Sequence, residues 1–184
     1  MTTEEKTLSS ERLYEGAILN LRKDKVTVKD GRTSYREIVE HNGGVVILGV
    51  TKEGLIPMIR QYRKPAGQVM LELPAGKLEK GEDPKEAALR EFKEETGYTA
   101  EKIRYITKFY TTLGYSEEIL YLYFAEGLEP GDTDFDDNES IDIEEYPPEA
   151  LYRLIEADEI NDGKTLVGLL LYRNYLTSTV ACIK

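Results

Sequence analysis

The chain has 184 residues, 32% of them charged and 40% hydrophobic, and its formal net charge is −11. This composition is typical of a globular water-soluble protein, and its negative charge makes a nucleic-acid duplex a poor partner. The sequence contains no transmembrane-length apolar run and no signal-peptide core, so we expect no membrane partner and a cytoplasmic location. The single cysteine, Cys182, excludes an intrachain disulfide and fits a reducing compartment.

The first predicted elements form an antiparallel β-ribbon. Its predicted strands cover residues 17–22, 25–29 and 34–40. Asp30 and Gly31 between the last two are typical of a hairpin turn. The alternation of these strands is only half apolar, so the ribbon would be a weak sheet by itself. We therefore expect the ribbon, residues 1–43, to pack on something else, such as a second subunit.

A second predicted domain, residues 44–184, mixes strands with helices. Its predicted strands cover residues 45–50, 55–62, 69–73, 103–110 and 119–125. Its predicted helices cover residues 84–96, 147–157 and 164–176, and residues 126–140 form an acidic loop. Asp162 is the predicted cap of the last helix. This order of elements indicates an α/β (α+β) fold, in which helices cover a mixed sheet.

The helix over residues 84–96 has clear boundary signals. Asp83 is a suitable N-cap, Pro84 suits the first helical position, and Gly97 ends the helix. These signals predict a helix over residues 84–96.

Carboxylates crowd one face of this helix. Glu91, Glu94 and Glu95 fall within one third of its circumference, and like charges four residues apart cost about 0.2–0.5 kcal/mol per pair. Arg90 can offset Glu94, four residues further on, but it cannot offset all three. A hard divalent cation, Mg²⁺ or alternatively Mn²⁺, can, because it binds carboxylate oxygens and phosphate. The structural alternative is a solvated acidic helix with charge pairs along its surface.

These residues belong to a longer pattern that resembles the box of the Nudix family. All seven fixed positions of that box are matched, by Gly76, Glu82, Arg90, Glu91, Glu94, Glu95 and Gly97. The resemblance implies an α/β/α sandwich and metal-dependent hydrolysis of a nucleoside diphosphate linked to another group. It implies the metal ligands Glu91, Glu94, Glu95 and the backbone carbonyl of Ala75. It also implies that Arg90 orients a glutamate, while Glu82 is either structural or a distant metal ligand.

The box does not identify a general base. In the ADP-ribose enzymes that the chain resembles, a glutamate on an acidic loop after the helix has this role. The resemblance therefore implies Glu139 as the base, with Asp137 as the second choice. The alternative is an acidic loop that is merely solvated.

The likeness extends beyond the box to bacterial ADP-ribose pyrophosphatases. It is carried by residues 36–41, 60–65 and 72–76. It implies a homodimer that exchanges its N-terminal ribbons and cleaves ADP-ribose to AMP and ribose 5-phosphate. Arg36 and Arg63 would contact the substrate, and Glu72 would lie near its adenine or ribose. The structural alternative for both arginines is an exposed charge on a strand.

One loop departs from this subfamily. Where a serine-proline-glycine run marks ADP-ribose preference, this chain has Thr112, Leu113 and Gly114. Leu113 and Gly114 are the predicted substrate contacts of the loop, but leucine does not fix φ as proline would. Other nucleoside diphosphate sugars, such as GDP-mannose or ADP-glucose, therefore stay open as substrates. A nucleoside triphosphate hydrolase and a non-catalytic nucleotide sensor are the remaining alternatives.

Overall fold

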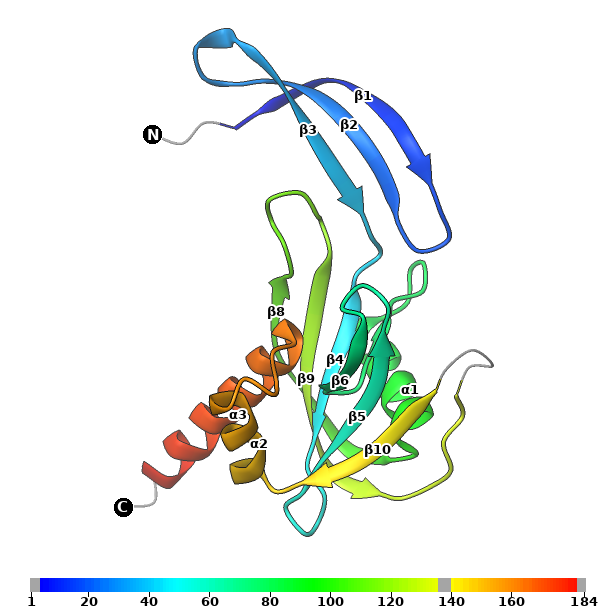
Figure 1. Cartoon of the computed structure of the whole chain (residues 1–184), viewed down its shortest axis with the longest axis vertical. Helices are drawn as coiled ribbons and strands as arrows, with labels where there is room; N and C mark the ends of the chain where they lie inside the picture. The colour runs from blue at the N-terminus through cyan, green and yellow to red at the C-terminus, as the bar shows by residue number, and fades with distance from the viewer. Residues whose placement is uncertain (1–3, 136–139, 182–184) are drawn as a thin grey trace. The chain divides into compact units, whose positions relative to one another are not determined.

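The computed structural model describes residues 4–135 and 140–181, with side chains up to Leu176 (Figure 1). The chain divides into two compact units. The ribbon unit comprises Met1–Gly43 and Phe109–Ile119, and the sandwich unit comprises Gly44–Lys108 and Leu120–Lys184. The sequence did not indicate that the segment 109–119 groups with the ribbon.

The ribbon unit contains a three-stranded antiparallel sheet in the order β1-β2-β3. Its strands are β1 (Lys6–Glu15), β2 (Asn20–Thr27) and β3 (Thr33–Glu40). The predicted third strand is confirmed, but the two short strands predicted before it are one strand, β2. Strand β1 was missed because all ten of its residues are exposed, so its sequence lacks the apolar alternation that marks a strand.

The hairpin turn between β2 and β3 is confirmed. A short 3₁₀ turn covers Lys29–Gly31, and both Asp30 and Gly31 have positive φ, 69° and 74°. Two central residues with positive φ match the right-handed twist of the flanking strands. Beyond this hairpin, β3 also binds the segment 109–119: the Val39 amide donates to the Tyr115 carbonyl at 2.7 Å.

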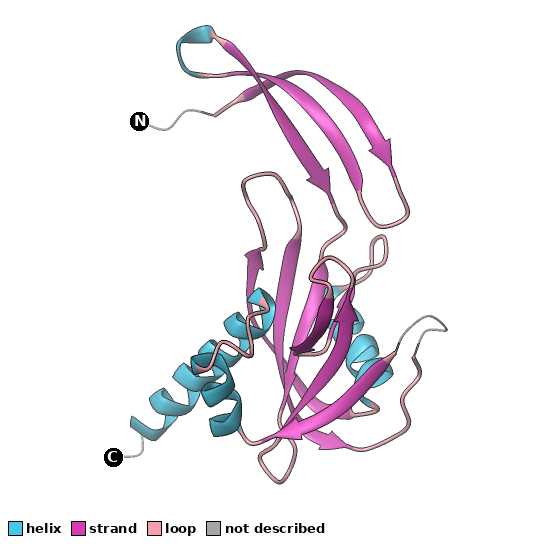
Figure 2. Cartoon of the chain, in the orientation of Figure 1, coloured by secondary structure: helices cyan, strands magenta, loops and turns pink. Residues whose placement is uncertain are grey.

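The sandwich unit contains two sheets, β7-β4-β9-β8 and β10-β5-β6 (Figure 2). Their strands are β4 (Gly44–Gly49), β5 (Ile56–Arg63), β6 (Gln68–Glu72), β7 (Ala75–Lys77), β8 (Thr99–Tyr110), β9 (Ile119–Glu129) and β10 (Ile141–Tyr146). Strand β4 runs parallel to β9 and antiparallel to β7, which confirms the predicted mixed sheet. Strand β7 was not predicted because it has only three residues. Strand β10 was not predicted because it directly follows the predicted acidic loop, which obscured where the strand begins.

Three helices accompany these sheets: α1 (Pro84–Thr96), α2 (Pro148–Glu156) and α3 (Gly163–Ala181). The predicted ends of α1 are confirmed, since the Asp83 side chain accepts two backbone hydrogen bonds and Gly97 has a φ of 75°. The cap of α3 is confirmed as well, because Asp162 Oδ2 accepts from the Thr165 amide at 3.1 Å. Within the described residues, no helix is long and apolar enough to span a membrane.

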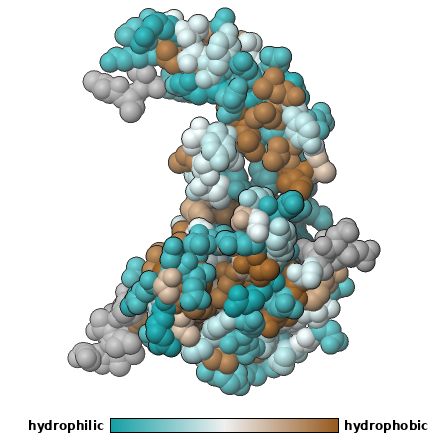
Figure 3. Space-filling view, viewed as in Figure 1, coloured by the Kyte–Doolittle hydropathy of each residue, from teal (hydrophilic) through white to brown (hydrophobic). Residues whose placement is uncertain are grey.

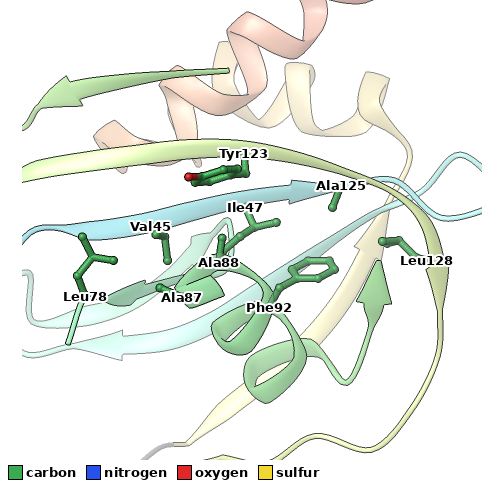
Figure 4. Packing of buried hydrophobic residues seen from close by; sticks show 9 residues of the cluster. All are labelled: Val45, Ile47, Leu78, Ala87, Ala88, Phe92, Tyr123, Ala125 and Leu128. Carbon is green, nitrogen blue, oxygen red and sulfur yellow. The ribbon is translucent and has the colours of Figure 1, made fainter. Parts of the chain in front are cut away.

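Helices cover both faces of the larger sheet. On one face, Val45, Ile47 and Tyr123 form a buried cluster with Phe92 of α1 (Figure 4). On the other face, the ring of Phe124 lies edge-on to Tyr172 of α3, with centroids 5.5 Å apart. Successive residues of a strand point to opposite faces, so β9 serves both layers. The predicted α/β/α sandwich is therefore confirmed.

Candidate active site and metal centre

Arg90 of α1 binds three carboxylates. Its Nε and Nη2 atoms donate to the two carboxylate oxygens of Glu82, at 3.0 and 3.1 Å. Its Nη1 atom donates to Glu91 at 2.9 Å and to Glu94 at 3.0 Å. The expected pairing of Arg90 with Glu94 is therefore confirmed, and the forked guanidinium also reaches the adjacent Glu91.

Glu82 is held by two partners at once. Besides Arg90, the Glu79 amide donates to its Oε2 atom at 2.9 Å. The hydrogen bond from Arg90, followed by that amide, lowers the pKa of Glu82 below its ordinary value. The same pairing raises the pKa of Arg90. Both groups therefore stay charged, and the arrangement favours a structural role for Glu82 over a role in binding metal.

Glu95 joins α1 to the strand that precedes it in the chain. Its residue is 4% exposed, and its Oε2 atom accepts a hydrogen bond from the Ala75 amide at 2.9 Å. Ala75 is the first residue of β7, which is antiparallel to the central strand β4. The backbone of Ala75, whose carbonyl oxygen is a predicted metal ligand, is therefore hydrogen-bonded to Glu95, another predicted ligand.

Gly76 leaves room for Glu91. A Cβ atom built on Gly76 would lie 1.8 Å from Glu91 Cδ and about as close to both carboxylate oxygens. No side chain fits in this space while Glu91 occupies it. The glycine of the box is thus required by a close approach between β7 and a side chain of α1.

The donors of this region fit a divalent cation. Glu91, Glu94, Glu95 and the Ala75 carbonyl offer hard oxygen atoms from two adjoining elements, the ligand type that Mg²⁺ and Mn²⁺ prefer. Across the described parts of the chain, no three acidic, histidine or cysteine side chains converge to form a complete site by themselves. Arg90 supplies positive charge between Glu91 and Glu94, where the carboxylates would otherwise repel each other.

A second charged cluster lies in the same unit. Arg63 forms a bidentate pair with Glu72, with both N–O distances at 2.8 Å. Glu72 is only 1% exposed, and it also accepts from Lys164 Nζ. Lys164 donates in turn to Asp162 at 2.9 Å. The sequence predicted Arg63 and Glu72 as site residues but not their pairing, and Lys164, 92 residues from Glu72, carried no sequence signal.

The cations of this cluster keep Glu72 ionised. Burial by itself would raise the pKa of Glu72, but the hydrogen bond from Arg63 and the charge of Lys164 outweigh it and lower the pKa. The pKa of Arg63 is raised mainly by Glu72, and Glu95 contributes to the same effect through its charge. The Glu95 carboxylate of α1 therefore interacts electrostatically with the Arg63–Glu72 pair.

The other predicted site residues are not part of the described sandwich unit. Arg36, Leu113 and Gly114 belong to the ribbon unit. Arg36 pairs there with Glu5, its Nε atom donating to Oε2 at 2.9 Å, and Leu113 is 74% exposed. The two predicted bases, Glu139 and Asp137, lie outside the described residues.

Replacing Gly76 by alanine tests the close approach of β7 to α1. We expect Gly76→Ala to displace Glu91 and weaken Mn²⁺ binding at least about 10-fold, the size of effect typical when a supporting residue of a metal site is lost. Isothermal titration calorimetry measures this affinity. Lys102→Ala is the control, because that side chain is 73% exposed and its strand, β8, lies at the opposite edge of the sheet from β7. Unchanged Mn²⁺ affinity in Gly76→Ala contradicts the prediction.

Glu72 should make stability depend on pH. We expect Glu72→Gln to lower the free energy of unfolding by about 3 kcal/mol at pH 7, since it breaks a buried ion pair. The native pKa lies below the ordinary 4.5, so ionised Glu72 stabilises the fold above that value and this contribution fades as pH falls through the native pKa. The difference between wild type and variant in urea denaturation should therefore be smaller at an acidic pH well below 4.5 than at pH 7.

The control for this measurement is Glu101→Gln, whose side chain is 72% exposed. We expect it to change the free energy of unfolding by no more than about 0.5 kcal/mol at either pH. If the effect of Glu72→Gln is equal at both pH values, the ionised pair does not stabilise the fold.

Comparison with known proteins adds to this geometry. The family model of the NUDIX domain matches residues 40–167, and that of the nucleoside diphosphate sugar hydrolase N-terminal domain matches residues 5–39. The chain is 44% identical to an ADP-ribose pyrophosphatase of Bacillus subtilis, over 90% of this chain and 91% of that protein. It is 41% identical to a methanol dehydrogenase activator of Bacillus methanolicus, over the same shares of the two chains.

The solved structure of an ADP compounds hydrolase shares the fold, with a TM-score of 0.86 over 97% of both chains at 21% identity. One family is indicated by the box residues, by the arrangement of α1 against β7 and by the match to the domain model. This chain belongs to the Nudix family of hydrolases, whose enzymes depend on divalent metal cations.

Proposed function

We propose that this chain is a Mg²⁺-dependent diphosphatase that hydrolyses ADP-ribose to AMP and ribose 5-phosphate, with Mn²⁺ as an alternative cation. One observation carries the proposal: α1 carries the three predicted carboxylate ligands of the box, and it adjoins β7 through the close approach at Gly76 and the Ala75–Glu95 hydrogen bond. The likeness to an ADP-ribose pyrophosphatase over nine tenths of both chains supports the substrate.

The residues have distinct roles in this proposal. A divalent cation, when bound, neutralises phosphate oxygens and lowers the pKa of a water molecule. Glu91, Glu94, Glu95 and the Ala75 carbonyl would hold the cation, and Arg90 orients Glu91 and Glu94 through its hydrogen bonds. Glu139 is the proposed general base, and Asp137 is the second candidate.

Substrate binding would use groups outside α1. The Arg63 side chain is 39% exposed. Its Nε and Nη2 atoms donate to Glu72, so its Nη1 atom can donate to a substrate oxygen. Glu72 holds the guanidinium plane in place while it does so. Arg36, Leu113 and Gly114 are the proposed contacts from the ribbon unit. Because leucine replaces proline at 113, GDP-mannose and ADP-glucose remain alternative substrates.

A nucleotide-binding regulator without turnover is the second candidate. The 41% identity to a protein named as an activator of another enzyme favours it. The intact carboxylate set of α1 favours catalysis, because binding alone does not need a metal-activated water molecule. A triphosphate hydrolase is less favoured, since the ribbon unit matches a domain of nucleoside diphosphate sugar hydrolases.

A product-resolved assay tests the function. We expect the chain with Mg²⁺ to release AMP and ribose 5-phosphate from ADP-ribose faster than it cleaves ADP-glucose, GDP-mannose or NADH. Glu95→Gln should lower this rate at least about 100-fold, because loss of a metal ligand costs more than loss of its supporting residues. Glu86→Gln, an exposed position on the same helix, is the control.

Three outcomes contradict the proposal. Faster cleavage of another nucleoside diphosphate sugar overturns the substrate. Tight binding of ADP-ribose without turnover in Mg²⁺ or Mn²⁺ favours the regulator. Full activity of Glu95→Gln overturns the metal site on α1.

Residues 1–43 are proposed as a dimerisation domain, with a homodimer as the working form. Large apolar side chains of the ribbon are exposed by 38–62%, and these are Leu8, Leu13, Tyr14, Ile18, Leu19 and Tyr35. Figure 3 shows apolar side chains gathered over part of the ribbon unit. Apolar surface of this kind marks an interaction site.

The single cysteine fits a reducing compartment, so the cytoplasm is the proposed location.

Light scattering tests the assembly. We expect wild type to have the mass of a dimer, and Leu13→Asp to shift the population to monomer because it places a charge in the apolar surface. Leu170→Asp, at 45% exposure on α3, is the control of comparable exposure outside the ribbon. A fully active wild-type monomer contradicts the dimer.

A further inference from the structure

We propose that the turn at the start of α3, residues 162–165, is a positioning element for the segment 72–75, on which the metal site depends. We call residues 162–165 the α3 clamp. The inference rests on the proposed function, because segment 72–75 carries the Ala75 carbonyl assigned above to metal. It assigns roles to Lys164 and Thr165, which lie outside the box and far from it in sequence.

Thr165 makes the most direct contact of the α3 clamp. Its residue is completely buried, and its Oγ1 atom accepts a hydrogen bond from the Leu73 amide at 2.9 Å. The same hydroxyl donates to Asp162 Oδ2 at 2.6 Å. A hydroxyl can accept and donate at once, so Thr165 links the cap of α3 to the backbone of the segment.

Lys164 makes the second contact. It donates to Glu72, the residue just before Leu73, and to Asp162 at 2.9 Å. Arg63 approaches Glu72 from its own strand, β5. The charges thus alternate from Asp162 through Lys164 and Glu72 to Arg63. Removing Lys164 would leave Glu72, a buried carboxylate, with one cation in place of two.

The other half of the segment is held by the sheet and by α1. The Pro74 carbonyl accepts from the Ile47 amide at 2.9 Å, and the Ala75 amide donates to Glu95 at 2.9 Å. Four consecutive residues, 72–75, therefore each have an anchor, beginning with the Lys164–Glu72 and Thr165–Leu73 contacts. The α3 clamp provides the first two anchors, so the direction in which the chain enters Ala75 depends on it.

The polar contacts of the α3 clamp are explained more by the backbone direction that they hold than by added stability. Apolar residues of similar volume often stabilise a fold as well as a buried ion pair does, whereas buried charges fix geometry. Lys164 and Asp162 are mostly buried, with side chains exposed by 13% and 22%, next to a strand that leads into the metal site. An ordered polar contact at this place holds the backbone direction that a metal ligand requires.

Two substitutions at Thr165 separate the hydrogen bond from packing. Thr165→Val keeps the shape but loses both hydrogen bonds, and we expect Mn²⁺ binding by the full chain to weaken about 10-fold in isothermal titration calorimetry. Thr165→Ser keeps the hydroxyl, and its Mn²⁺ affinity should stay within about twofold of wild type. Leu151→Ala, a fully buried position on α2, controls for a general loss of stability. It should lower the melting temperature and leave Mn²⁺ affinity unchanged.

The outcomes are distinct. Equal Mn²⁺ affinity in Thr165→Val and wild type overturns the positioning role, and so does an equal loss in Leu151→Ala. If Thr165→Val does not fold, Lys164→Met is measured against Lys164→Arg, and equal affinities overturn the proposal. The readout is metal binding, so it decides the role of the α3 clamp even when wild type cleaves no nucleotide sugar. That last result instead overturns the proposed function.

Discussion

The proposed active site depends on one arginine that holds three carboxylates together. Without Arg90, Glu91 and Glu94 would repel each other on the same helical face, and Glu82 would lack its bidentate partner. The guanidinium remains charged throughout the physiological pH range, and hydrogen bonding to Glu82 raises its pKa further. The proposed metal-binding face of α1 is thus held together by charges of the protein itself.

The position of this face relative to the sheet has a separate cause. Glu91 lies where a side chain on residue 76 would be, and Glu95 binds the Ala75 amide, so Glu91 keeps this place against β7 only with glycine at 76. On the far side of the same segment, Thr165 binds the Leu73 amide. The short stretch between β6 and β7 is consequently held by two helices that cover opposite faces of the sheet.

Local signals in the sequence predicted those parts of the structure that local interactions determine. The bounds of α1 follow from Asp83 and Gly97, and the turn at Asp30 follows from its residue types. Strand β1 could not be predicted, because a fully exposed strand has no hydrophobic period. The Lys164–Glu72 contact could not be predicted either, since it joins residues 92 positions apart and no local pattern in the sequence pairs them.

In the proposed mechanism, α1 and β7 together bind the catalytic cation. Crystals soaked in Mn²⁺ and measured near the manganese absorption edge test it most directly, because anomalous scattering locates the ion without reference to activity. We expect an anomalous peak in contact with the carboxylates of Glu91 and Glu95 and the carbonyl of Ala75. A manganese ion bound elsewhere, in crystals of an enzyme that cleaves its substrate, would contradict it.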